Sequence, residues 1–116
     1  MNSEAIDETA IDRLRKAGGE ALLIGLKNLY LKNTPDKMKA IKDAMQSGDL
    51  ETLEKTAHVL ISSAGHLGGM GVSNLSQQVE LAARAGNKDA ALSLVPELIE
   101  KELEFTEYLR NNVIDI

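Results

Sequence analysis

The chain has 116 residues, a net charge of −5 and no cysteine. This length suits one domain, 1–116, and the acidic balance disfavours a nucleic-acid binder, which would carry a basic face. The lack of cysteine excludes disulfides and thiolate metal sites, and no apolar run reaches the roughly 20 residues that span a bilayer. We therefore expect one cytoplasmic domain that does not enter a membrane, and the start at Met1 favours a free-standing protein over an excised domain.

Helical periodicity extends over almost the whole chain. Asp7 is a suitable N-cap for a short first helix, which Gly18 and Gly19 end. A longer helix follows, in which Pro35 removes a backbone donor and is expected to cause a kink or a brief break. The predicted helices after the first one span residues 20–46, 50–67, 72–85 and 88–111.

Each of these helices carries apolar side chains at intervals of three and four residues, which is the spacing of one buried face. Long amphipathic helices with short connections form antiparallel bundles. The expected fold is all-α, an antiparallel up-down four-helix bundle with a short additional N-terminal helix that caps one end. The side chains expected to face the core of the bundle are Leu22, Leu26, Leu29, Met38, Ile41, Met45, Leu53, Ala57, Leu60, Ala64, Leu67, Val72, Leu75, Val79, Ala82, Leu92, Val95, Ile99, Leu103 and Leu109.

His58 lies one residue outside the apolar stripe of the helix over 50–67, so its imidazole is expected to be exposed. Ser62 and Gly65 follow on the same face and leave room for another protein to approach. Histidine is nucleophilic near neutral pH because a large fraction of its side chains is uncharged there. Glu80, on the adjacent helix, is a candidate acceptor for the second ring nitrogen. The alternative is that His58 is an ordinary polar residue at the edge of the bundle.

The sequence around His58 resembles the signature of the histidine-containing phosphotransfer (HPt) domains of multistep two-component relays. The positions that match are Ala57, His58, Leu60, Ser63, Ala64, Leu67, Gly68, Leu75, Val79, Glu80, Arg84 and Gly86. The resemblance covers nearly the whole chain and implies a four-helix bundle. It implies that His58 takes a phosphoryl group from the aspartyl phosphate of one receiver domain and passes it to another, and that Glu80 hydrogen-bonds the imidazole.

The same resemblance implies the partners of the protein and its independence of cofactors. The partners would be a response-regulator receiver domain and a hybrid sensor kinase, and the protein itself is expected to be a monomer. In such relays the receiver supplies the Mg²⁺ and the acidic residues that hold it. We therefore expect this chain to need no metal or other cofactor of its own.

Two positions depart from the family pattern. Ile61 stands where the family has a lysine that offsets the charge of the phosphoryl group, and Ser62 stands where it has a glycine. Lys55, one turn before His58, is a candidate replacement for that charge, and Ile61, Ser62 and Gly65 are expected to contact the receiver. The departures keep a second function open, that of an HPt-like adaptor that docks on a receiver or kinase without relay chemistry.

Other classes of function find less support. His66 lies two turns from His58, too far for the two imidazoles to share a metal ion, and is interpreted as a solvated or capping residue. No catalytic dyad, phosphate loop or metal-ligand cluster indicates an independent enzyme. A purely structural bundle would leave the small residues beside His58 unexplained.

Overall fold

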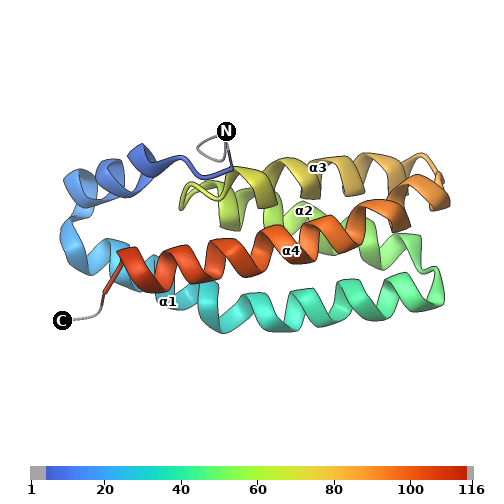
Figure 1. Ribbon diagram of the computed structural model, residues 1–116, viewed down its shortest axis with the longest axis horizontal. Coiled ribbons are helices and arrows are strands. Elements are labelled where there is room, and N and C mark those ends of the chain that lie inside the picture. The colour runs from blue at the N-terminus through green and yellow to red at the C-terminus, as the bar shows by residue number, and fades with distance from the viewer. Residues whose placement is uncertain (1–4, 115–116) are drawn as a thin grey trace.

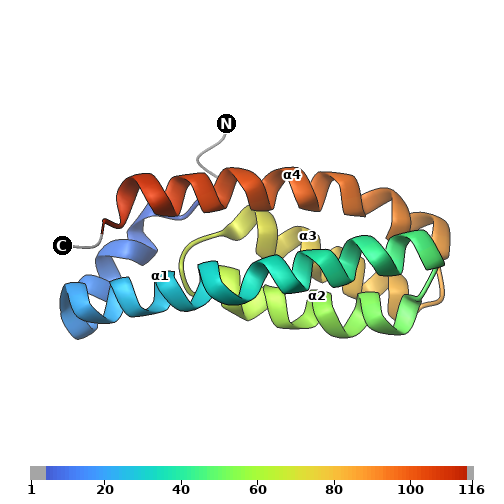
Figure 2. The ribbon, with the colours of Figure 1, turned by 90° about the horizontal axis from the view of Figure 1, so that it is seen from below.

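The computed structural model describes residues 5–114, which form four α-helices and, within that range, no β-strand. Helix α1 spans Glu8–Ser47, α2 spans Leu50–Gly65, α3 spans Met70–Arg84 and α4 spans Lys88–Asn112. From residue 20 onward the helices lie side by side, and successive helices alternate in direction (Figure 1 and Figure 2). None of the described helices is both long enough and apolar enough to cross a membrane. The expectation of an all-α fold is therefore confirmed.

Helix α1 is interrupted at Gly19, whose φ of 75° and ψ of −175° lie outside the helical region. A positive φ is accessible to glycine because it has no Cβ, so the break falls where the glycine pair predicted it. Asp7 caps the start of α1 by accepting a hydrogen bond from the backbone N–H of Thr9 at 3.1 Å. The chain reverses direction at Gly19, and the segment before it lies at one end of the molecule (Figure 1).

Of the kink or brief break expected at Pro35, the break is absent, because Gly19 is the one residue within α1 that has non-helical backbone angles. Proline takes away the hydrogen bond that would otherwise reach the carbonyl of Leu31. Pro35 itself lies on the exposed side of α1, and on that side of a helix solvent can replace a lost backbone hydrogen bond. The helix therefore continues through Pro35.

The core-facing side of α2 agrees with the sequence prediction. Its five predicted core residues are each at most 2% exposed: Leu53, Ala57, Leu60, Ala64 and Leu67. Asp49 caps the helix by accepting from the backbone N–H of Thr52 at 3.1 Å. The helix ends at Gly65, earlier than the expected Leu67, because the chain turns tightly into Gly68, which has a φ of 89°.

The core-facing side of α1 agrees with the prediction after Pro35, where Met38 and Ile41 are buried, and differs from it between Gly19 and Pro35. Leu22 and Leu29, both expected inside, are 38% and 56% exposed. The buried face is shifted by one residue and includes three side chains with polar groups, since its members between Gly19 and Pro35 are Leu23, Lys27, Tyr30 and Thr34. This shift occurs because Lys27 and Tyr30 find partners on α4 and just beyond it, so they can be buried without a large cost.

Two hydrogen bonds from α1 to the C-terminal part of the chain account for this face. The ammonium group of Lys27 donates to the carbonyl oxygen of Val113 at 2.8 Å. The hydroxyl of Tyr30 donates to Oε2 of Glu102 at 3.2 Å, and the hydroxyl of Thr106 donates to the same oxygen at 2.5 Å. Burial and the charge of Glu102 raise the pKa of the Tyr30 hydroxyl far above its ordinary value.

Helix α4 shows the same kind of difference at Leu103, which was expected inside but is 64% exposed. Glu102 takes the inward position instead and is only 6% exposed. The remaining core positions of α4 are apolar, namely Ala91, Val95, Leu98, Phe105 and Leu109. The predicted Val95 and Leu109 are among them, whereas Leu92 and Ile99 are only partly buried.

Helices α2 and α3 approach one another through small side chains. The buried members on α3 include Ser73, Ser76 and Ala83, and those on α2 include Ala57 and Ala64. The hydroxyl of Ser73 donates to the carbonyl oxygen of Ile61 at 2.8 Å and so links the two helices. A Cβ added to Gly65 would lie 3.3 Å from the Ser73 hydroxyl, which explains why a glycine is used at that point. This close contact sets the position of α3 relative to His58.

Candidate functional site

His58 lies near the middle of α2, and its side chain is 70% exposed. Its neighbour Ala57 and the residue two positions on, Leu60, are fully buried, so the helix turns the imidazole away from the core. The exposure expected from the phase of the helix is confirmed.

Glu80 of α3 supplies the partner of the imidazole. Its Oε2 lies 2.6 Å from Nδ1 of His58, and its side chain is only 9% exposed. A carboxylate can only accept a hydrogen bond, so Nδ1 is the ring nitrogen that carries the proton. The second nitrogen, Nε2, then holds an unshared electron pair, and the direct contact between Glu80 and His58 that the sequence predicted is present.

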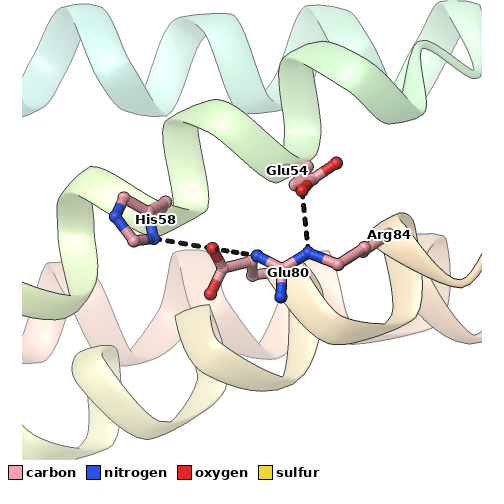
Figure 3. Close-up of polar contacts among 4 residues, drawn as sticks. All are labelled: Glu54, His58, Glu80 and Arg84. Atoms are coloured by element: carbon pink, nitrogen blue, oxygen red, sulfur yellow. Dashed lines mark hydrogen bonds and ion pairs between the residues drawn. The ribbon is translucent and has the colours of Figure 1, made fainter.

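Two further residues extend this contact, and sequence reasoning assigned neither of them a role. The guanidinium of Arg84 donates through Nη2 to Glu80 Oε2 at 2.8 Å and through Nε to Glu54 Oε2 at 2.9 Å. Figure 3 shows the four side chains in one row, with Glu54 and His58 on α2 and Glu80 and Arg84 on α3. The signal available in the sequence was the spacing, because Glu54 precedes His58 by four residues and Arg84 follows Glu80 by four.

The electrostatics of this row alternate in sign from Glu54 to Arg84 to Glu80. The hydrogen bond that Arg84 donates to Glu54 and the charge of Glu80 raise the pKa of Arg84 above its usual value. The guanidinium is therefore a permanent positive charge beside the carboxylate that holds His58. The Glu80 side chain is only 9% exposed, so little of the carboxylate is in contact with solvent.

The other predicted site residues surround His58 on α2. Ile61 is partly buried, Ser62 is exposed and Gly65 is partly buried, so all three border the surface near the imidazole. Lys55 is highly exposed, with its Nζ 3.7 Å from Oε2 of Glu51, one turn earlier on the same helix. The structure therefore brings His58 and Glu80 into contact, while Lys55 is paired with a carboxylate of α2.

His66 forms the C-cap of α2 and lies apart from the row that contains His58. It lines a groove between α1 and α2, about 240 Å³ in volume, together with apolar side chains that include Leu29 and Val59. Within residues 5–114, no group of three or more histidine, cysteine or acidic side chains is placed to hold a metal ion.

The chemistry available at this site is that of an exposed nucleophile with a fixed proton. Nε2 of His58 can attack an electrophile that arrives from solvent, while Nδ1 keeps its hydrogen bond to Glu80. The carboxylate then stabilises the positive charge that the ring acquires when Nε2 forms a bond.

Comparison with known proteins agrees with this geometry. A family model described as the Hpt domain matches residues 25–111. Among solved structures, the chain is similar to the crystal structure of histidine-containing phosphotransfer protein B (HptB) from Pseudomonas aeruginosa PAO1, with a TM-score of 0.84. The two sequences are 18% identical, and the match covers 92% of each chain, which shows a shared fold. No curated protein matches the chain.

Proposed function

The chain belongs to the Hpt family of histidine phosphotransfer domains, which carry phosphoryl groups in phosphorelays, and on this premise we propose that His58 is its phosphoacceptor. The observation that carries the proposal is the exposed imidazole whose Nδ1 is held by the buried carboxylate of Glu80. His66 lacks such a setting, because it caps the end of α2 beside the groove.

The transfer step is a displacement at phosphorus. Nε2 of His58 attacks the phosphorus atom of an aspartyl phosphate on a receiver domain, and the bond from phosphorus to the aspartyl oxygen breaks. The electron pair of that bond leaves with the aspartate carboxylate. The ring becomes a phosphorylated imidazolium whose Nδ1–H still donates to Glu80, so no proton has to move. Attack by the aspartate of a second receiver reverses these changes and restores the neutral imidazole.

The remaining parts of the proposal concern the contact with the receiver. We assign Ile61, Ser62 and Gly65 to the docking surface because they border His58 on the same face of α2. Lys55 is proposed to turn from Glu51 toward the transferred phosphoryl group, a movement that its high exposure allows. The receiver, rather than this chain, would hold the Mg²⁺ that neutralises the phosphoryl oxygens.

We further propose that residues 1–116 form one domain, an antiparallel up-down four-helix bundle in which residues 8–18 are a short additional helix. The alternating helix directions and the break at Gly19 support this description. The protein would act as a monomer in the cytoplasm, where its cysteine-free sequence suits a reducing compartment, and would bind no nucleic acid because of its net charge of −5.

The experiment that tests the proposal compares the wild-type protein with His58→Gln and His66→Gln. Each is mixed with receiver domains phosphorylated on aspartate, and acid-labile phosphate on this chain is measured. Wild type and His66→Gln should become labelled and His58→Gln should not. Binding of the receivers without any label on the wild type would instead identify an adaptor, and equal labelling of all three proteins would place the phosphoacceptor elsewhere.

A further inference from the structure

We propose that Arg84, held in place by Glu54, is a positioning residue that fixes His58 in the tautomer able to attack phosphorus; this inference rests on the proposed role of His58. The observation behind this inference is the register of α2 against α3. Glu54 and His58 lie one turn apart on α2, and Glu80 and Arg84 lie one turn apart on α3. Because α2 and α3 run in opposite directions (Figure 1), Glu54 meets Arg84 one turn away from the point where His58 meets Glu80 (Figure 3).

Glu80 needs a second partner because its carboxylate is largely withdrawn from water. A carboxylate in such a place is costly unless it has hydrogen bonds and a counter-charge. His58 in its nucleophilic, uncharged form supplies a hydrogen bond but no charge. Arg84 supplies both, through its 2.8 Å contact with the same oxygen that accepts from His58. Without Arg84, the Glu80 side chain would gain by turning its carboxylate to solvent and away from Nδ1.

Glu54 restricts the conformation of the Arg84 side chain. The side chain of Arg84 is 55% exposed, and a long exposed arginine has many accessible rotamers. Nε of Arg84 donates a hydrogen bond to Glu54 at 2.9 Å. Because the guanidinium is planar, fixing Nε also directs Nη2 toward Glu80. A lysine at this position would pair with one carboxylate but would not present two donors in one plane.

The consequence for His58 is the choice of tautomer. In water an uncharged imidazole carries its proton mainly on Nε2, the nitrogen that must be free for attack. Only an acceptor held at Nδ1 reverses this preference. The row of Glu54, Arg84 and Glu80 therefore raises the share of molecules in which Nε2 bears the electron pair.

The test uses the intact protein and the variants Arg84→Met, Arg84→Lys and Glu54→Gln. Arg13→Met is the matched control, because Arg13 is likewise an exposed arginine paired with a carboxylate, that of Asp7 near the N-terminus. Nitrogen-15 spectra of the histidine rings at about pH 8, where imidazoles are ordinarily uncharged, show which ring nitrogen carries the proton. His66 gives an internal reference in the same spectra, and thermal unfolding followed by circular dichroism confirms that each variant is folded.

We expect the wild type and Arg13→Met to hold the His58 proton on Nδ1. Arg84→Met should move most of the population to the Nε2–H form, while Arg84→Lys and Glu54→Gln should give intermediate populations. The rate at which phosphoramidate, a small phosphoryl donor, modifies His58 should fall by a factor of about 3 to 10 in Arg84→Met. An unchanged tautomer in folded Arg84→Met overturns the inference. A change of tautomer in Arg84→Met, together with a wild type that accepts no phosphoryl group from any donor, overturns the proposed function instead and leaves the positioning of the His58 proton by Arg84 supported.

Discussion

Removing the charge of Glu80 should slow phosphotransfer by an amount that its contact with His58 sets. A hydrogen bond to a charged group contributes about 1.5–3 kcal/mol when it is shielded from water. The Glu80 side chain is buried but the imidazole is 70% exposed, so solvent weakens the contact and we take a value at or below the lower limit of this range, about 1–1.5 kcal/mol. Because about 1.4 kcal/mol corresponds to a factor of ten in rate, Glu80→Ala should transfer about 5 to 12 times more slowly than the wild type.

The variant Glu80→Gln separates the two contributions of this side chain. Its amide oxygen can still accept from Nδ1 but carries no charge, so we expect a decrease of only about twofold to fourfold. Rapid mixing with a phosphorylated receiver, followed by quantification of phosphohistidine, gives the transfer rate. Glu107→Gln, at an exposed position of α4, serves as the control. If both Glu80 variants transferred at the wild-type rate, the carboxylate would not stabilise the charge that develops on the ring.

Three more outcomes are expected. Ile61→Lys should raise the transfer rate several-fold and Lys55→Ala should lower it, with receiver affinity measured separately; unchanged rates in both would show that charge at these positions does not limit transfer. Leu60→Ala should lower the free energy of unfolding in urea by about 2–5 kcal/mol, because this fully buried leucine would leave a cavity. The pKa of Tyr30 is raised in the folded state, so its contribution to stability is complete below its ordinary pKa of about 10 and decreases as pH rises above it. Tyr30→Phe should therefore flatten the loss of stability between about pH 10 and 11, and an identical slope in the variant would rule out this linkage to Glu102.

The sequence predicts best where local chemistry decides the structure. The cap at Asp7 and the break at Gly19 follow from a side-chain acceptor and a positive φ, which depend on a few adjacent residues. The buried face of α2 follows from apolar residues alone, and the exposure of His58 follows from that face. In each case the cause and its consequence lie within one helix.

The prediction fails where a polar residue is buried by a partner that is distant in sequence. Periodicity places Leu22 and Leu29 inside because it counts Lys27 as a surface residue, yet Lys27 bonds a carbonyl 86 residues away. Glu102 is likewise buried because it accepts a hydrogen bond from Tyr30, which lies 72 residues away in the chain. Leu103, next to it on α4, is left exposed as a result. Such pairings depend on how α1 and α4 pack, which no pattern within either helix contains.

The same difference between local and long-range contacts applies to the residues of the site. The contact between His58 and Glu80 could be predicted because family resemblance and helix phase both indicated it. Glu54 has the appearance of an ordinary surface residue, and Arg84 matches the family signature without that match indicating a role. Their role becomes apparent only when the register of α2 against α3 is known, since each then faces a partner on the other helix (Figure 3). The four-residue spacings were visible, but many exposed pairs share that spacing and contribute little.

The charged side chains around His58 indicate which protein neutralises the negative charge of the phosphoryl group. Arg84 is engaged by two carboxylates, and Lys55 lies beside Glu51, so both cations already have partners before a phosphoryl group arrives. Ile61 adds an apolar side chain where the family has a further cation. A phosphoryl group brings roughly two negative charges into this surface. We therefore expect the receiver to contribute most of the compensating charge, so that phosphohistidine on this protein is attacked most readily while the receiver remains docked.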